Sequence, residues 1–508
     1  MSNRNNLRMW PAYVILGLLL VVYALIWFAD ASSRQVQVMQ TLGATILGII
    51  LLTLWSLLFS KLSGRTRLKV AGVCAAVVLV ATGLFRIQGV TGDFVPILTW
   101  RWASQEYGTI VSAGEAGDLL IADYPGFLGP NRNAVIEGVT LKDWTVAPPK
   151  ELWRIKIGQG WSAFSVSGQT AVTQEQRGED ECVVAYDLLT GQQLWVHKDA
   201  TRYDSPIGGI GPRATPTISN GKVYTVGSTG MMNCLRLSDG AVLWSKNIVD
   251  ENEATIPDWG LACSPLVLGG NVIVSPGGKD QRSLVAYDAQ DGAFVWGAGT
   301  RRAGYSSPSI HTVAGRDQIL IFNKGSVAGH DPSMGTVLWK VPWPGGTECV
   351  AQPLPITENR VFVSSGYGIG CRLFEITPSD DGFDAEVLYE TPRLKAKFAN
   401  FVHYEGYIYG LDDGILVCLD PKTGERMWKR GRYGHGQLLR VGDKLILQTE
   451  DGEVVLIRPV PDKLIELGQV ASFNSKTWNN PVLAGSLLIV RNDKEAVCYE
   501  LALDVPNS

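Results

Sequence analysis

The sequence has little charge and little cysteine. Only 19% of its 508 residues are Asp, Glu, Lys or Arg, 8 are cysteine, and the net charge is −4. So few cysteines exclude a small secreted domain held together by disulfides, and the absence of a basic excess argues against a nucleic-acid partner. A hydrophobic content of 46%, with 16 tryptophans, excludes a disordered chain. The length leaves room for a large core or for about three domains of ~150 residues.

Familiar catalytic and metal-binding motifs are also missing. The sequence contains no H-E-x-x-H, no phosphate-binding glycine loop, no Ser-His-Asp order and no C-x-x-C-H for covalent haem. Four cysteines lie outside both the apolar runs and the repeat motifs, Cys182, Cys263, Cys349 and Cys371. They show no metal-ligand spacing, and the five histidines are scattered. We therefore expect no metal site and no catalytic residue, and the sequence leaves open whether any disulfide forms.

Apolar residues gather at the front of the chain in three runs, whose interiors carry no Lys, Arg, Asp or Glu. The runs extend from Trp10 to Ala29, from Met39 to Ser60 and from Leu68 to Phe85, and the last helix is expected to end at about residue 87. Their lengths match the ~20 residues that a helix needs to cross a bilayer. A cleavable signal peptide is the alternative for the first run, but the run exceeds a signal core of about 7 to 15 residues and no A-x-A-like site follows. Residues 1–90 are predicted to be a membrane anchor.

Basic residues in the short flanking segments set the expected orientation. Because basic loops stay in the cytoplasm, the N-terminus and residues 61–69 are predicted to be cytoplasmic, and three crossings of the cytoplasmic membrane then place the rest of the chain outside. If the third run does not cross, the rest of the chain is cytoplasmic. Residues 1–90 carry a net charge of +7, so the other 418 residues carry −11. The basic residues used are Arg4, Arg8, Lys61, Arg65, Arg67 and Lys69.

Residues 91–150 are expected to be a linker and lead-in, and after them one motif repeats. It consists of a small residue, then x-Asp-x-x-x-Gly-x-x-x-Trp. Two complete copies are Ala185, Asp187, Gly191, Trp195 and Ala286, Asp288, Gly292, Trp296. Three further copies keep the spacing: Cys234, Arg236, Gly240, Trp244; Gly329, Asp331, Gly335, Trp339; and Cys418, Asp420, Gly424, Trp428.

Each copy is predicted to be a β-hairpin, with Asp opening the turn and Gly at a position that needs a positive φ. A further hairpin precedes each motif, so a unit has about four strands, as in the blades of a β-propeller. A degenerate unit carries Leu373, Glu375 and Tyr389, and a seventh carries Leu456 and Arg458. An eighth unit, from Trp478 to Glu500, lacks its Trp strand, which residues 151–157 with Trp153 supply. We predict an all-β, eight-bladed propeller over residues 151–505, with seven blades as the alternative.

The repeat resembles the tryptophan-docking motif of the quinoprotein, or PQQ-like, eight-bladed β-propellers. That family contains PQQ-dependent alcohol and glucose dehydrogenases, and also non-enzymatic members similar to the B lipoprotein of the bacterial outer-membrane β-barrel assembly machinery. The segment from Asp123 to Arg132 is similar to the opening of many bacterial PQQ-like propeller proteins. The resemblance implies the fold and does not decide the activity.

A candidate site lies where the innermost strands begin, at the mouth of the central channel. Seven of the eight equivalent positions there are polar, which suggests a site for a small polar ligand. The other interpretation is that these residues cap the strands and hold channel water. The ring consists of Ala163, Thr215, Ser264, Ser307, Gln352, Asn400, Gln437 and Asn480, joined by Trp161, Arg213, Lys397, His435 and Trp478.

The resemblance implies PQQ with Ca²⁺ as the cofactor of the dehydrogenases, which needs oxygen ligands for the ion and a base carboxylate. No ring position is Asp or Glu, and the adjacent cysteine pair of the alcohol dehydrogenases is missing. Asp204, Asp258 and Glu348 lie in nearby loops, where acids are ordinarily solvated surface.

These observations favour a non-catalytic platform in the bacterial cell envelope that binds envelope proteins, peptides or another ligand. The alternative is a membrane-bound quinoprotein dehydrogenase that oxidises alcohols or sugars. A sensor that signals through the helices is a third hypothesis.

Overall fold

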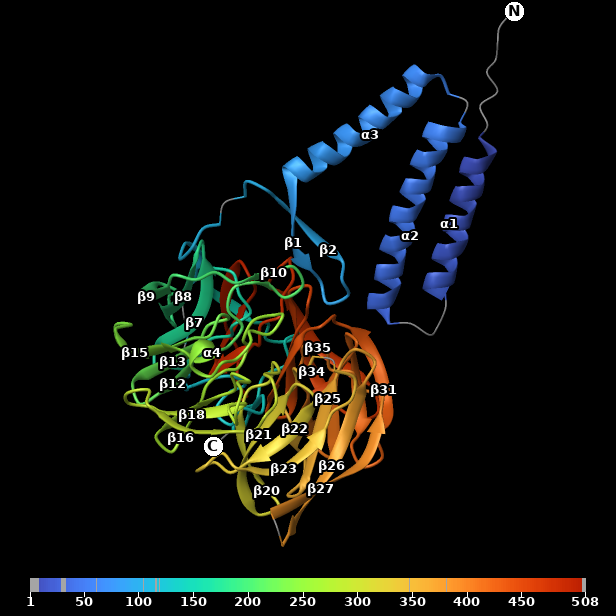
Figure 1. The fold of residues 1–508 in the computed structure, drawn as a ribbon. Helices are drawn as coiled ribbons and strands as arrows, with labels where there is room; N and C mark the ends of the chain where they lie inside the picture. Colours follow the sequence, from blue (N-terminus) through green and yellow to red (C-terminus); the bar gives the residue numbers. More distant parts are fainter. Residues whose placement is uncertain are drawn as a thin grey trace, which may run out of the picture. The chain divides into compact units, whose positions relative to one another are not determined.

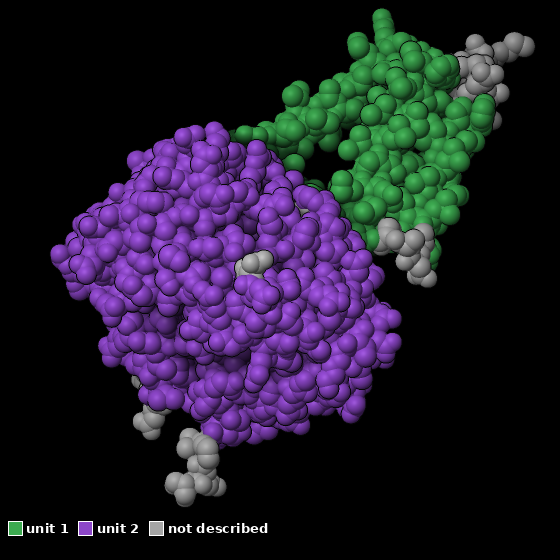
Figure 2. All heavy atoms as spheres, turned by 60° about the horizontal axis from the view of Figure 1, so that its bottom comes forward, with its two compact units in different colours: residues 1–104 green, residues 105–508 purple. Residues whose placement is uncertain are grey.

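The computed structural model describes residues 9–28, 33–60, 62–103, 105–114, 117, 119–346, 348–380 and 382–504. Arg4, Arg8, Ala29, Lys61 and residue 505, which entered the predictions, lie outside these ranges. The chain divides into two compact units, Met1–Ser104 and Gln105–Ser508 (Figure 2). Each unit is described by itself below.

The first unit holds three helices, within its described residues, that are long and apolar enough to cross a membrane: α1 (Trp10–Phe28), α2 (Arg34–Leu54), which continues as the π-helical turn η1 (Trp55–Phe59), and α3 (Gly64–Leu84). Helices α1 and α2 are linked by Tyr23 Oη and Thr45 Oγ1 at 2.8 Å. The three helices indicate that the chain is anchored in a membrane.

The start of α2 and both ends of α3 differ from the prediction. Helix α2 begins at Arg34 and not at Met39, because the polar residues that precede the apolar run continue its first turns. Helix α3 begins after Ser63, whose side chain accepts from the backbone N–H of Thr66, and ends at Leu84. Residues 85–87, expected at its end, belong instead to an antiparallel hairpin of β1 (Phe85–Val90) and β2 (Pro96–Trp100).

The second unit is an eight-bladed β-propeller across its described residues, as predicted, with the sheets arranged around a central axis (Figure 1). Every blade contains four antiparallel strands, and each sheet runs from an innermost to an outermost strand. The first four blades are β6 (Ser165–Ser167), β7 (Thr170–Arg177), β8 (Asp180–Asp187), β9 (Gln193–Asp199); β12 (Thr217–Ser219), β13 (Lys222–Val226), β14 (Met231–Arg236), β15 (Val242–Asn247); β16 (Leu266–Leu268), β17 (Asn271–Val274), β18 (Leu284–Asp288), β19 (Phe294–Ala298); and β20 (Ser309–Val313), β21 (Arg316–Asn323), β22 (Ser326–His330), β23 (Val337–Pro342).

The other four blades follow the same order. They are β24 (Leu354–Pro355), β25 (Arg360–Ser365), β26 (Gly370–Ser379), β27 (Gly382–Thr391); β28 (Val402–Tyr404), β29 (Tyr407–Asp412), β30 (Ile415–Asp420), β31 (Glu425–Arg432); β32 (Gln437–Val441), β33 (Lys444–Gln448), β34 (Glu453–Pro459), β35 (Leu464–Ala471); and β36 (Val482–Ala484), β37 (Leu487–Arg491), β38 (Glu495–Glu500), β5 (Lys150–Lys156). Outside this pattern lie β3 (Ile110–Ala113), β4 (Val135–Ile136), the hairpin of β10 (Asp204–Ser205) and β11 (Gly209–Ile210), and the short helix α4 (Ile248–Glu251).

The ring closes where the first and last parts of the propeller meet. Strand β5 pairs with β38 and sets Trp153 opposite Cys498, the same register that sets Trp244 opposite Cys234. This pairing removes the open edges that a chain of blades would leave. Strand β3 adds a fifth strand outside β5, which the sequence did not predict.

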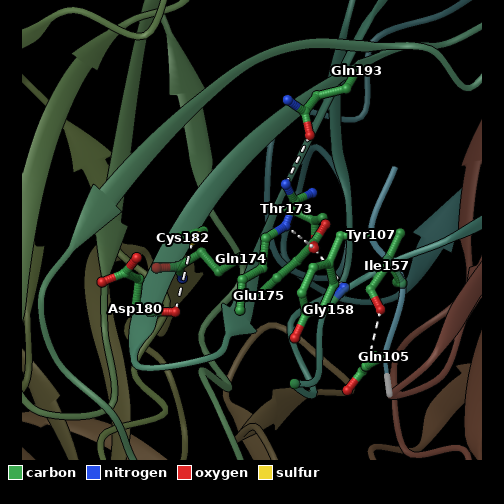
Figure 3. A network of polar contacts seen from close by, with 12 residues as sticks. Gln105, Tyr107, Ile157, Gly158, Thr173, Gln174, Glu175, Asp180, Cys182 and Gln193 are labelled. Carbon is green, nitrogen blue, oxygen red and sulfur yellow. Dashed lines mark hydrogen bonds and ion pairs between the residues drawn. The ribbon is translucent and has the colours of Figure 1, made fainter. Parts of the chain in front are cut away.

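Buried polar groups secure the same junction. The guanidinium of Arg491 on β37 is fully buried and donates to Thr173 Oγ1 at 2.6 Å and to the carbonyls of Gln174 and Gly158 at 3.0 Å. Figure 3 shows the neighbouring contacts, in which Gly158 N donates to the carboxylate of Glu175 and Gln105 Nε2 donates to Ile157 O. Each of these bonds satisfies a group that would be costly to leave unpaired in the interior.

The repeated motif joins neighbouring blades. The five motif glycines, Gly191, Gly240, Gly292, Gly335 and Gly424, have φ between 70° and 74°. At each of them an added Cβ would lie 2.3 to 2.9 Å from an aromatic ring of the preceding blade, for example from Trp195 at Gly240. Glycine is therefore needed there both for the backbone conformation and for the space that the ring occupies. In the degenerate blade Tyr389 lies opposite Leu373, and its ring meets Gly424.

Candidate functional site

The predicted ring residues form a belt of hydrogen bonds around the channel. Along most of the belt, a backbone N–H of one blade donates to the ring side chain of the next. The bonds run from Ala163 N to Thr215 Oγ1 (3.2 Å), Thr215 N to Ser264 Oγ (2.9 Å), Ser264 N to Ser307 Oγ (2.9 Å), Ser307 N to Gln352 Oε1 (3.2 Å) and Gln352 N to Asn400 Oδ1 (2.8 Å). The structure brings these residues together and uses their side chains to link blades.

The belt changes where the last blades meet the first. Gln437 Nε2 donates to the carbonyls of Phe398 and Trp478 at 3.0 and 3.2 Å. Asn479 Nδ2 donates to the carbonyls of Gly160 and Ser162, so it completes the link across the closing junction. Asn479 was missed because the repeat alignment placed its neighbour Asn480 at the ring position. The consecutive Asn-Asn pair was the signal available.

An open pocket of about 790 Å³, including its mouth, lies beside this belt. Six of the predicted residues line it: Trp161, Arg213, Asn400, Gln437, Trp478 and Asn480. The lining does not include Thr215, Ser264, Ser307, Gln352 or Lys397, which stand in the belt or behind the wall. Five further lining residues were not predicted from the sequence: Phe127, Ile207, Trp259, Tyr305 and Phe398. They come from the lead-in and from long loops, where the blade repeat carries no register.

Aromatic rings form a continuous wall of this pocket. The ring centroids of Trp161 and Trp478 are 5.0 Å apart, and those of Trp478 and Phe398 are 4.9 Å apart. Phe398 meets Trp259 at 5.6 Å, and Trp259 stacks on Tyr305 at 4.8 Å. Such contacts hold one another's orientation. The wall is therefore an ordered apolar surface.

Cationic groups flank the aromatic wall. Lys476 Nζ lies 4.0 Å from the ring centroid of Trp478 and 4.6 Å from that of Trp161, and burial lowers the pKa of Lys476 to about 8. Arg213 lies 4.6 Å above the ring of Tyr203 and donates to Gly209 O at 2.7 Å, and burial lowers its pKa to about 10. Lys397 is buried, with Nζ 5.2 Å from the ring of Tyr367. These geometries are those of cation–π contacts, which hold the cations against the wall.

Glu450 ties the wall to the belt. Its carboxylate accepts from Trp478 Nε1 at 2.9 Å and from the backbone N–H of His435 at 3.0 Å. Glu450 and His435 are both buried. His435, which was predicted to join the ring site, therefore lies behind the lining and helps to hold Glu450 in place.

The lead-in closes the pocket from below. Tyr124 N donates to Val166 O on the innermost strand β6, and Ile218 N on β12 donates to Pro125 O. Arg132 is buried and donates to the carbonyls of Ser264 and Pro265 at 2.8 and 2.9 Å. Phe127 on the same segment lines the pocket. The central cavity is therefore a depression with a floor.

Comparison with known proteins places the chain in a family. A family model described as "Outer membrane protein assembly factor BamB" matches residues 137–256 and 179–430. The chain belongs to this family. BamB of Escherichia coli K12 is 21% identical over 314 residues, which cover 57% of this chain and 74% of that protein.

Solved structures agree on the fold. The structure of BamB from Moraxella catarrhalis is matched with a TM-score of 0.51 and 16% identity, over 69% of this chain and 97% of that one. The quinohemoprotein alcohol dehydrogenase ADHIIG from Pseudomonas putida HK5 is matched with a TM-score of 0.55 and 13% identity, over 76% and 82%. The predicted resemblance to PQQ-like propellers and to BamB is confirmed. At these identities the likeness to solved structures shows the fold alone.

The site residues do not fit Ca²⁺ with PQQ. Among the described residues, no three His, Cys, Asp or Glu side chains are grouped so that they could hold a metal ion, and the described lining contains no carboxylate. Of the loop acids, Glu348 lies 3.8 Å from Lys324 and Asp204 lies 3.5 Å from Arg202. All eight cysteines lie in described segments, and none of them is in a disulfide.

Proposed function

We propose that this chain is a non-catalytic, membrane-anchored propeller of the BamB family that binds a segment of an envelope protein or peptide in the aromatic pocket. The observation that carries the proposal is the open pocket itself, with a continuous aromatic wall, a closed floor and no described carboxylate in its lining. Clefts with largely apolar, aromatic walls and a few polar groups are typical binding sites.

The chemistry of the wall favours an apolar or aromatic side chain as the inserted group. Aromatic residues dominate the energetic centres of protein interfaces because they bury a large area at low entropic cost. Asn400 and Asn480, which line the pocket, offer amide groups to the backbone of such a segment. Family membership supports a role beside envelope proteins, since the relatives are described as outer membrane protein assembly factors.

The proposed location is the cytoplasmic membrane, crossed three times, with the propeller on the extracytoplasmic side. Within the first unit, Arg34 at the start of α2 lies 3.3 Å from Asp93 in the turn of the hairpin that follows α3. This contact supports an arrangement in which α2 begins on the side of the membrane where α3 ends. The basic residues before α3 then place that side outside the cytoplasm.

Site-specific crosslinking in cells tests the binding proposal. A photo-crosslinking phenylalanine in place of Ile207, which lines the pocket and is 40% exposed, is expected to form an adduct with an envelope protein. Trp259→Ala, which opens the aromatic wall, is expected to reduce the adduct about tenfold. Phe294→Ala removes an exposed aromatic on the outer strand β19 and is the matched control, expected to leave the adduct unchanged.

Two results would overturn the proposal. One is an adduct that Trp259→Ala and Phe294→Ala reduce equally, because binding would then not depend on the pocket. The other is a rise in melting temperature with PQQ and Ca²⁺, accompanied by dye-linked oxidation of an alcohol or sugar, which would establish the quinoprotein alternative.

A further inference from the structure

The β1–β2 hairpin presents one apolar face. In its register Phe85 pairs with Trp100 and Ile87 pairs with Leu98, so these four side chains share a face of the two-stranded sheet. Their exposed fractions are 40, 46, 66 and 61%, respectively. Arg86 and Thr99, which pair between them, lie on the other face. A face of this size without a covering partner inside the unit is unusual for a segment bathed in water.

Aromatic contacts extend this face. Phe85 and Trp100 meet edge to face with centroids 5.4 Å apart, and Trp102 meets Trp100 at 5.6 Å. Trp102 is itself 64% exposed. Tryptophan is typical of the belt that membrane proteins place at the boundary between acyl chains and headgroups, and phenylalanine and leucine are common on the apolar face of elements that lie there.

The position of the hairpin in the chain puts the face at that boundary. Helix α3 ends at Leu84 and β1 begins at Phe85, so no residue separates them. The first two turns of α3 carry Arg65, Arg67 and Lys69, and the charge-free residues 70–84 span about 22 Å, less than the ~30 Å hydrocarbon core. The apolar residues that follow Leu84 therefore lie at the outer boundary of the hydrocarbon or just inside it.

Hydrogen bonds hold the hairpin at the helix end. Arg101 N donates to Leu84 O at 2.9 Å, and Arg101 Nη2 donates to Thr82 O at 2.8 Å. At the other end of the hairpin, Asp93 contacts Arg34 at the start of α2. Both ends of the hairpin are thus tied to helix ends that the membrane places at its surface.

We infer that the β1–β2 hairpin is an interfacial membrane-binding element, whose apolar face of Phe85, Ile87, Leu98 and Trp100, extended by Trp102, inserts into the lipid at the end of α3. The polar face with Arg86 remains toward the headgroups and water. The inference depends on α3 crossing the membrane and is independent of what the pocket binds. It fixes the depth at which the third span ends.

Paired cysteine labels on neighbouring residues test this inference in the full-length protein, reconstituted in phosphatidylcholine and phosphatidylglycerol vesicles. Cys74 is the exposed one of the eight cysteines, so Cys74→Ser provides the background. Ile87→Cys and Arg86→Cys then place an environment-sensitive fluorophore on opposite faces of one strand, and Leu98→Cys repeats the apolar position on the second strand. Lipids with a nitroxide near the start of the acyl chain, and aqueous iodide, serve as quenchers.

We expect at least threefold stronger lipid quenching at positions 87 and 98 than at position 86, and the opposite order with iodide. Iodide quenching that is equal at 86 and 87, without lipid quenching, would show that the face lies in water. Shielding of 87 and 98 from both quenchers would show that protein covers it. Either result overturns the inference. Agreement between positions 87 and 98 shows that the result does not arise from one label that disturbs the hairpin.

Discussion

Glu181 is a carboxyl group placed in the interior of the first blade. It is 3% exposed, and both of its oxygens accept from the backbone N–H of Ser228, at 3.2 and 3.1 Å. Burial penalises the charged form more than these hydrogen bonds favour it, which raises the pKa of Glu181 to about 7. The protein therefore folds more favourably with this group protonated.

The sign of the pH dependence follows from this raised pKa. An unfolded chain loses the proton near pH 4.5 and the folded chain near pH 7, so the contribution of Glu181 to stability falls as the pH rises between these values. The loss is complete above about pH 7 and amounts to roughly 3 kcal/mol. We expect Glu181→Gln to unfold at a higher temperature than the wild type at pH 8 and at the same temperature at pH 4.

Differential scanning calorimetry of the detergent-solubilised protein at the two pH values measures this effect. Glu179→Gln alters an acid two residues away whose side chain is 86% exposed, and it should shift neither melting temperature. A Glu181→Gln protein that gains no stability at pH 8 would show that the carboxylate is accommodated in its charged form.

Single residues in the ring also show the limit of sequence reasoning. The polar types at the channel mouth were predicted from the alignment of units, yet only the structure separates those that link blades, such as Ser264, from those that line the pocket, such as Asn480. A side chain of a given type serves either purpose, and its surroundings decide which.

Blades hold together through contacts that pass from one element to the next. The ring of Trp296 on β19 lies where a Cβ on Gly335 of the following blade would stand, at 2.3 Å from the nearest ring atom. Gly335 also has a φ of 73°. An alanine there would therefore face both a strained backbone conformation and a clash with the Trp296 ring. The spacing of the motif predicted the hairpin, and it did not show that the glycine serves the neighbouring blade.

Two glycines of the fourth blade separate the two costs. Gly315 has a φ of 77°, and an added Cβ would have no neighbour within 4 Å. Gly315→Ala should therefore lower the unfolding free energy by about 1 to 2 kcal/mol through backbone strain alone. Gly335→Ala should cost a further 1 to 3 kcal/mol or so, because the Trp296 ring must move. Denaturant unfolding followed by circular dichroism measures both. Equal losses for the two variants would mean that the ring does not pack against the next blade.

Elements that lie outside the repeat escaped prediction. The closing pair of β5 and β38 was predicted because each half carries part of the repeat, and it is confirmed. Strand β3, strand β4 and the lead-in under the pocket carry no repeat, so the sequence gives no signal for their partners, which depend on the path of the chain in three dimensions. Strand β1 lies in the part predicted to end the membrane anchor, and β2 lies in the predicted linker. Both were missed because strands of five or six residues give a weak periodic signal.

On the scale of the whole molecule, charge and hydropathy are divided between two units. The anchor segment is basic and apolar, and the propeller is acidic. The proposed topology predicts that alkaline phosphatase fused after Ser508 is active in cells, whereas green fluorescent protein exported to the same position by the general secretory route stays dark. Fusions after Ser63, between the second and third spans, should give the opposite result. A bright fluorescent fusion at Ser508 would contradict the proposed side of the membrane.

The sequence by itself determined the three membrane spans and the eight blades, since hydropathy marks membrane spans and a repeated hairpin motif marks blades. Both signals are local in the sequence, and both can be recognised without knowing which residues pack against one another. Only the tertiary structure decided that the ring side chains form a belt, that Asn479 completes it, that five aromatic rings from separate segments make one wall, and that the lead-in gives the pocket a floor. These features depend on distances between residues far apart in the chain, and such distances are set by the closure of the whole ring.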